Sequence, residues 1–167
     1  MTARKTAVLG MLMAAGILLQ LLESFVPVVM IVPGYKIGLA NIVGLAALYL
    51  YGPKDMVIVT SGRIVLASLL TGTIFSVAFI LSVTGGILSM AVMALTYKTR
   101  KFSIYGVSVA GAAAHSLGQV AAITVIYQQY FMQMFAPILL ALSIVSGLLT
   151  ALVARLLLKR VRGVRHV

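Results

Sequence analysis

The chain has 167 residues, of which 62% are hydrophobic and 9% charged, and its 13 Lys and Arg against 2 Asp and Glu give a net charge of +11. A soluble domain carries about 25% charged residues, so this composition excludes a water-soluble fold and predicts a protein covered mostly by lipid. Two carboxylates exclude an Asp-rich magnesium site. The absence of cysteine excludes disulfides, thiolate zinc sites and iron–sulfur clusters, and the sequence has no P-loop.

Six apolar segments follow one another along the chain. A helix needs about 20 apolar residues to cross the hydrocarbon core of a bilayer. The segments are Thr6–Leu22, Lys36–Tyr51, Asp55–Leu70, Thr73–Tyr97, Ser103–Tyr127 and Ala136–Leu158. They predict one all-α integral membrane domain over residues 1–167, a bundle of six transmembrane helices. Because the second and third segments are short, four or five crossings remain open.

The basic residues favour six crossings with both termini in the cytoplasm. In that topology the cytoplasmic side receives Arg4, Lys5, Lys54, Lys98, Arg100, Lys101, Lys159, Arg160, Arg162 and Arg165, and the outside receives Lys36. Membrane proteins concentrate Lys and Arg in their cytoplasmic loops. The same rule accounts for the net positive charge, so we expect membrane lipid and no nucleic acid among the partners.

Small residues recur at helical spacing in two segments. Such stripes allow another helix to approach closely. The first segment carries Ala3, Ala7, Gly10 and Ala14, for which we expect packing inside the fold, with docking of a membrane partner as the alternative. The fifth segment carries Gly106, Ala110, Ala114, Gly118 and Ala122, for which we again expect packing within the chain, with a subunit interface as the alternative. Gly85-Gly86 could mark a kink or a close packing point.

Arg63 lies midway along the third segment. It is eight residues beyond Asp55, which places it about 12 Å deeper along a helix, too deep to reach the interface easily. An ionisable residue at this depth costs several kcal/mol unless it is paired or hydrated. Glu23 is the internal carboxylate that could pair with it. Without that pair, Arg63 requires an anion from outside the chain or a water-filled cavity.

Other polar residues could join Arg63 in one site. After Pro33 and Gly34, the second segment places Lys36 at its outer mouth and Asn41 one to two turns further in, where a helix N-terminus favours anions. His115 and Gln119 are four residues apart and share a helical face. The predicted binding residues are Lys36, Asn41, Arg63, His115 and Gln119. If they converge, they form an outward-opening cationic cavity for a small, largely apolar molecule with a negative group; no metal site is expected.

Several runs resemble one family. Residues 34–43 (GYKIGLANIV) and 47–54 (ALYLYGPK) resemble the signature of the Gx transporter family, often labelled heptaprenyl diphosphate synthase component I. Residues 63–66 (RIVL) and 108–119 (SVAGAAAHSLGQ) resemble its other blocks. The family is similar in turn to the substrate-binding S components of energy-coupling factor transporters, which are small six-helix proteins with cytoplasmic termini.

The resemblance implies a role in uptake. An S component captures a nutrient from outside, and a coupling membrane protein with two cytoplasmic ATPases drives its release. Docking to the coupling protein would use the small residues of the first segment. The implied location is a bacterial or archaeal plasma membrane, and the candidate substrates are prenyl phosphates, quinone precursors, flavins and vitamin-like molecules.

On this reading the chain is not an enzyme and carries no cofactor. The alternative is a noncatalytic membrane subunit associated with prenyl diphosphate or quinone synthesis. A third interpretation is a homo-oligomeric pore or a purely structural membrane subunit.

Overall fold

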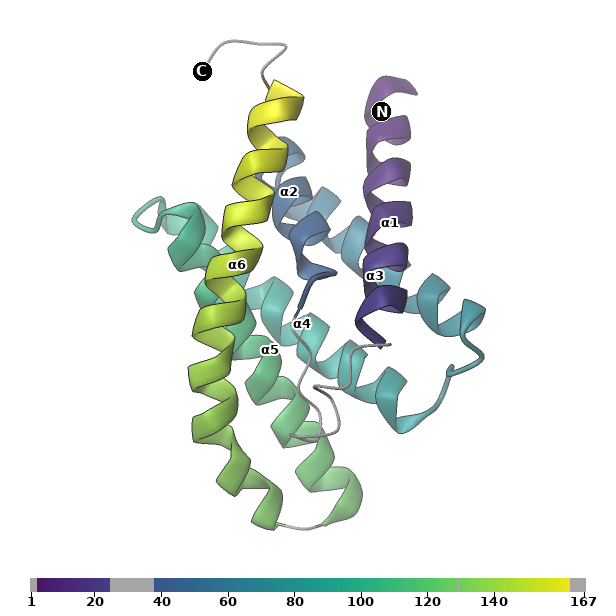
Figure 1. Cartoon of the computed structure of the whole chain (residues 1–167), viewed down its shortest axis with the longest axis vertical. Coiled ribbons are helices and arrows are strands. Elements are labelled where there is room, and N and C mark those ends of the chain that lie inside the picture. Colours follow the sequence, from purple (N-terminus) through teal and green to yellow (C-terminus); the bar gives the residue numbers. More distant parts are fainter. Residues whose placement is uncertain (1–2, 25–37, 129, 163–167) are drawn as a thin grey trace.

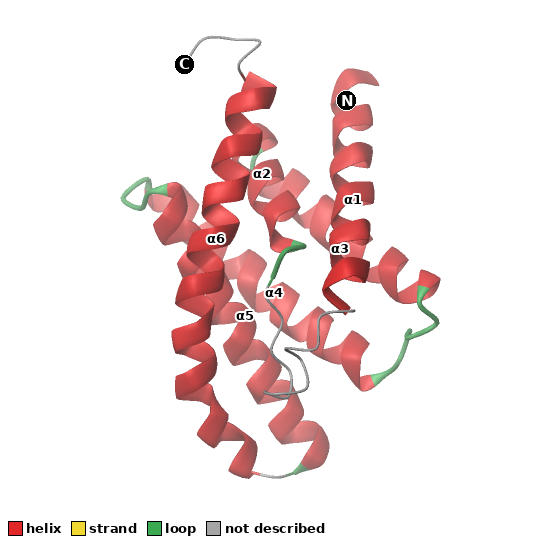
Figure 2. Ribbon diagram, viewed as in Figure 1, coloured by secondary structure: helices red, strands yellow, loops and turns green. Residues whose placement is uncertain are grey.

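The computed structural model describes residues 3–24, 38–128 and 130–162. Within these ranges the backbone forms helices and turns and contains no strand (Figure 1; Figure 2). The helices are α1 (Ala3–Ser24), α2 (Asn41–Tyr51), α3 (Pro53–Leu70), α4 (Val77–Thr99), α5 (Ile104–Tyr127), the 3-10 helix η2 (Tyr130–Phe135) and α6 (Ala136–Arg162). The all-α fold predicted from the sequence is confirmed.

Four helical stretches of the described chain are long and apolar enough to cross a bilayer. They are Ala3–Glu23, Val77–Thr99, Ile104–Tyr127 and Gln133–Val161. α2 has 11 residues, which gives a length of about 16 Å and therefore about half of a hydrocarbon core. α3 has 18 residues but carries Lys54, Asp55 and Arg63. The chain is thus a multi-pass membrane protein, and six crossings remain a prediction.

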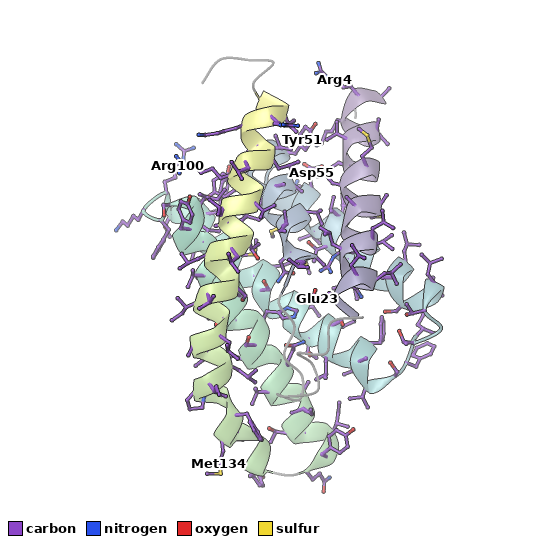
Figure 3. All side chains as sticks on the ribbon, viewed as in Figure 1. Arg4, Glu23, Tyr51, Asp55, Arg100 and Met134 are labelled. Atoms are coloured by element: carbon purple, nitrogen blue, oxygen red, sulfur yellow. The ribbon has the colours of Figure 1, made fainter. Side chains whose placement is uncertain are left out.

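The described chain begins and ends at the same end of the molecule. α1 starts and α6 finishes there, whereas α5, η2 and the start of α6 form the turn at the opposite end (Figure 1). Arg4 marks the first end and Met134 the second (Figure 3). This arrangement agrees with an even number of crossings.

α2 lies at the centre of the bundle and contacts α1, α3 and α6. Its residues Ile42–Leu48 are all buried, and Leu45 and Leu48 have no exposed surface. Met56, Val107 and Ala151, from three other helices, belong to the same core cluster. A helix that is apolar on every side is stable when other helices surround it, which explains how so short a segment holds its place.

Two helices begin later than the sequence predicted. The fourth segment was expected from Thr73, but α4 begins at Val77, because the hydroxyl of Ser76 accepts a hydrogen bond from Phe79 N (3.3 Å) and caps the helix. The second segment was expected from Lys36, but α2 begins at Asn41, after a turn in which Gly38 has φ +80°. Only glycine adopts that conformation without strain.

The glycines of α4 and α5 serve close packing. A Cβ on Gly118 would lie 2.9 Å from the Cα of Gly85, and a Cβ on Gly111 would overlap the side chain of Met93. α4 runs without a break through Gly85 and Gly86, so this pair is a packing point rather than a kink. The expectation that the α5 stripe packs within the chain is confirmed at Gly118 and at Ala114, which is buried.

Candidate functional site

A small cavity lies in the middle of the bundle, where α1, α3, α4, α5 and the start of α2 meet. Its volume is about 20 Å³, enough for about one water molecule. The lining residues are Gln20, Glu23, Gly38, Ala40, Asn41, Arg63, Ile64, Ser82 and His115. Glu23 is seen between the two ends of the molecule, far from both Arg4 and Met134 (Figure 3). Helices from both halves of the chain therefore bring polar groups to one interior point.

Arg63 is the cation of this cavity, and it is only 5% exposed. Its Nη1 donates a hydrogen bond to Oε1 of Gln20 (2.9 Å), while its Nε has no hydrogen-bond partner among the described residues. Gly16 makes room for the side chain, because a Cβ there would lie 2.7 Å from Cδ of Arg63. Arg63 therefore presents a positive charge and an unused Nε–H donor at the cavity wall.

The two carboxylates of the sequence are used elsewhere than on Arg63. Asp55 forms an ion pair with Lys5 at 2.8 Å, at the end of the molecule where α1 begins. Glu23 accepts a hydrogen bond from the backbone N–H of Gly38 (2.6 Å). Although Glu23 and Arg63 line the same cavity, these two described residues form no ion pair within 4 Å. The predicted partner thus lies nearby and acts on Arg63 electrostatically, without a direct ion pair.

Gln20 is the partner that the sequence analysis missed. It precedes Glu23 by three residues on α1, so both side chains fall on the same helical face. This spacing was the available signal, because a glutamine and a glutamate on one face of an apolar helix need a common polar environment. A guanidinium bound to an amide oxygen still carries its full positive charge.

The start of α2 points into the cavity from the interior of the protein. Ala40 occupies the N-cap position and provides no side-chain hydrogen bond to the first turn. The N–H groups of Asn41 and Ile42 already donate to the carbonyls of Gly38 (2.9 Å) and Leu39 (3.2 Å), so α2 contributes the positive end of its dipole rather than open donors. Asn41 was expected one to two turns inside the helix; instead it is the first helical residue and lines the cavity.

A second cavity of about 10 Å³ adjoins the first. The two share Gly38, Asn41 and His115. The wall of the second cavity is rich in hydroxyl groups, which α4, α5 and α6 supply through Ser89, Ser108, Ser116, Ser146 and Thr150. Ser108 donates a hydrogen bond to the carbonyl of Gly147 on α6 (2.7 Å). Polar groups therefore extend from Arg63 across the bundle to α6.

The predicted binding residues are brought together in part. Asn41, Arg63 and His115 line one cavity. Gln119 lies one turn beyond His115 on α5, is 4% exposed, and has no hydrogen-bond partner for its Nε2 within the described ranges, but it lines neither cavity. Lys36 lies outside the described residues. The role of all five in binding remains a prediction.

The small residues of α1 face outward. All four predicted positions, Ala3, Ala7, Gly10 and Ala14, are exposed. A Cβ added to Gly10 would meet nothing within 4 Å. The expectation that they pack inside the fold was wrong, because α1 instead buries Leu9, Leu12 and Gly16 against the bundle. The outer face of α1 thus carries a row of small residues against which another helix could pack closely.

Comparison with known proteins gives one match. The sequence profile of a family described as heptaprenyl diphosphate synthase component I matches residues 12–157. This range includes every described residue that lines either cavity. Comparison with curated proteins and with solved structures gave no match.

Proposed function

The chain belongs to the heptaprenyl diphosphate synthase component I family, and from its central cavity we propose that it is the substrate-binding membrane component of an uptake transporter of the energy-coupling factor type. Its ligand is a small anionic or amphipathic metabolite captured from outside the cell. The buried Arg63, whose Nε has no hydrogen-bond partner among the described residues, is the observation that carries this proposal.

An anionic ligand would supply a direct counter-ion and a hydrogen-bond acceptor for Arg63. A buried charge costs several kcal/mol in a low-dielectric interior unless a counter-ion or water compensates for it. Carboxylates and phosphates pair with a guanidinium through two N–H groups, and the free Nε gives Arg63 an open donor for such a pair. The N-terminus of α2 adds favourable polarity at the same wall.

The hydroxyl-lined cavity supports a ligand with further hydrogen-bonding groups. Asn41 and His115 border both cavities, so a molecule held at Arg63 would extend past them toward the hydroxyls of α5 and α6. Among the candidate classes, flavins, quinone precursors and vitamin-like molecules carry such groups along their length. The two volumes are water-sized, so a ligand can enter only if the walls move apart.

Partner docking in this proposal uses the exposed face of α1. A coupling membrane protein would pack against Ala3, Ala7, Gly10 and Ala14, where helix backbones can approach closely. In the proposed topology both termini are cytoplasmic, which puts this face at the side where the two ATPases act. Ala7→Leu should weaken copurification of the coupling protein at least fivefold, whereas Ala141→Leu, at an exposed position of α6, should leave it unchanged. Equal recovery with both variants would remove the docking surface from the proposal.

The first test is native mass spectrometry of the protein purified in mild detergent. A retained molecule should appear as additional mass carrying an acidic group. Arg63→Gln should abolish retention and uptake into proteoliposomes that contain the coupling protein and ATPases. Arg155→Gln is the matched control, since Arg155 is an exposed arginine on α6 that binds the hydroxyl of Tyr105 (3.2 Å). Retention that survives Arg63→Gln would refute the proposal.

The family name favours a second candidate, a noncatalytic membrane subunit of prenyl diphosphate synthesis. A diphosphate is also an anion, so Arg63 could serve this role with the same chemistry. The distinguishing experiment is deletion of the chain followed by analysis of prenyl chain length, together with copurification of a soluble prenyl synthase. Altered products and stable copurification would favour the synthase role, whereas unchanged products with lost uptake would favour transport.

A further inference from the structure

Glu23 is a buried carboxylate that the proposed function does not yet use. The sequence has two acidic residues, and the other, Asp55, is paired with Lys5 through both of its oxygens at 2.8 Å. Glu23 is 5% exposed and lies in the middle of the bundle (Figure 3). Placing a carboxylate there costs several kcal/mol, so its surroundings must favour the negative charge.

Those surroundings are the ones that an anionic ligand would require. The carboxylate accepts the N–H of Gly38 (2.6 Å), immediately before α2, whose first turn has no side-chain cap. It lines the same cavity as Arg63, which is nine-tenths buried and has an unused Nε. An amide N–H and a guanidinium are donors that proteins use to bind phosphates and carboxylates, and the positive end of the α2 dipole favours the same charge.

With Glu23 in place, the cavity as described has no room for a ligand anion. Its volume of about 20 Å³ admits about one water molecule, which is less than a phosphate or a carboxylate group needs. Two negative charges a few ångströms apart would also repel strongly where the effective dielectric constant is low. Since the walls must move apart for a ligand to enter, the Glu23 carboxylate is the wall group that an anion at Arg63 would repel.

We propose that Glu23 is a built-in competitor: in the ligand-free protein its carboxylate occupies the position of the ligand's anionic group, and binding displaces it from Gly38. This inference rests on the proposed function, since it concerns the same cavity. It assigns Glu23 a role opposite to that of Arg63, because Arg63 promotes binding and Glu23 opposes it. It also gives the N–H of Gly38, in the turn before α2, two alternative acceptors, the Glu23 carboxylate and the anionic group of the ligand.

A purely structural role for Glu23 makes the opposite prediction. If the carboxylate only fastens the end of α1 to the turn before α2, its loss should weaken the fold and bring no gain in affinity. Competition predicts that the neutral isostere binds anions more tightly. The two readings can therefore be separated by affinity measured on folded protein.

The experiment measures binding of inorganic pyrophosphate and of acetate by titration calorimetry in detergent, at a temperature where every variant is folded. Glu23→Gln should bind the better probe at least tenfold more tightly than the unmodified chain, and Arg63→Gln should abolish binding in both backgrounds. Asp55→Asn is the matched control, since it removes the same charge from outside the cavity and should leave the affinity unchanged. The stronger of the two probes indicates whether the ligand carries a phosphate or a carboxylate.

The outcomes separate this inference from the proposed function. Binding that depends on Arg63 but is not tightened by Glu23→Gln would overturn the competitor role and leave the anion site in place. A gain as large with Asp55→Asn as with Glu23→Gln would also overturn it, because net charge alone would then explain the effect. Absence of binding in all variants, or binding independent of Arg63, would count against both.

A second measurement uses the unmodified chain and does not depend on a variant that folds. Dicyclohexylcarbodiimide labels carboxyl groups in apolar surroundings, and with two acidic side chains in the sequence the labelled peptides are unambiguous. Saturating pyrophosphate or acetate should increase labelling of Glu23 at least threefold and leave Asp55 unchanged. Unchanged labelling, or protection of Glu23 by the bound probe, would show that the carboxylate is not displaced.

Discussion

Gly118→Ala tests a close backbone contact between two helices, the crossing of α4 and α5 beside the candidate site. A Cβ at this position would stand 2.9 Å from the Cα of Gly85, the carbonyl oxygen of Thr84 and the Cδ1 of Leu88. Two of these three atoms are backbone, so no side-chain rotation can clear the space. The helices themselves must separate.

The size of the effect follows from the contact distance. Carbon atoms meet favourably at about 3.5–4.0 Å, so α4 and α5 must move apart by roughly 0.6–1.1 Å at this point. Overpacking of this kind costs about 1–3 kcal/mol, and the better helix propensity of Ala offsets up to about 1 kcal/mol. We expect a net loss of about 1–2 kcal/mol, which lowers Tm by roughly 2–8 °C for a chain of this size.

The assay is thermal unfolding followed by circular dichroism at 222 nm in detergent, since the sequence has no Trp or Cys for fluorescence methods. Gly10→Ala is the matched control, because the same substitution on α1 meets nothing within 4 Å and should leave Tm unchanged or slightly raised. A Gly118→Ala protein as stable as Gly10→Ala would refute the packing argument. It would mean that α4 and α5 are not in contact at this crossing.

Three further predictions concern other contacts. Ser76→Ala removes the hydroxyl that caps α4 at Phe79 N and should cost about 1 kcal/mol of helix stability, seen as a lower Tm; an unchanged Tm would contradict the cap. Asp55→Asn leaves Lys5 without its counter-ion and should lower the free energy of unfolding by about 1–3 kcal/mol. Adding Lys5→Met should restore part of that loss, whereas additive losses in the double variant would show that the two residues are not coupled. Arg63→Lys keeps the positive charge but loses the planar guanidinium with its paired N–H donors. Ligand retention in native mass spectrometry should therefore fall at least tenfold while Tm changes little, and full retention would mean that charge alone is sufficient for binding.

The order of the helices could be predicted from hydropathy because each described helix is an apolar run between polar or glycine-containing turns. The helix ends could not be predicted as well. Thr73 and Ser76 both carry hydroxyls that can cap a helix, and the choice of Ser76 depends on a turn in which Phe75 adopts φ +66°. Ser76 N donates to the carbonyl of Thr73 (3.0 Å) and closes that turn, and a positive φ at a bulky residue such as Phe75 is not expected from local propensity.

The sequence predicted several residues of the candidate site but only part of the contacts between them. Arg63, Asn41 and His115 stand out in the sequence because polar residues in apolar helices are costly, and the structure places them on one cavity. The hydrogen bond from Arg63 to Gln20 joins residues 43 positions apart, so only the packing of α1 on α3 could reveal it. The hydroxyls of the second cavity were missed because isolated serines are ordinary in membrane helices.

The outward face of α1 could not be assigned from the sequence for a different reason. Periodicity shows that Ala3, Ala7, Gly10 and Ala14 share a face, but in lipid both the exposed and the buried faces of a helix are apolar. Met11 is 64% exposed and Leu12 is 8% exposed, although the two residues have similar hydrophobicity. Packing against the neighbouring helices, and not composition, therefore decides which face of α1 is turned outward.

The position of α2 connects the candidate site to the proposed docking surface. Its first turn lies at the cavity, and its last residue, Tyr51, lies under the ammonium of Lys5 (5.4 Å from the ring centroid), at the end where α1 begins. Because α2 is buried along Ile42–Leu48 and has only 11 residues, it must move as one rigid body if its start moves. If displacement of Glu23 from Gly38 moves the start of α2, Tyr51 would shift against Lys5, next to the exposed face of α1. In the proposed transporter, α2 would then connect an occupied site with the surface that a coupling protein meets.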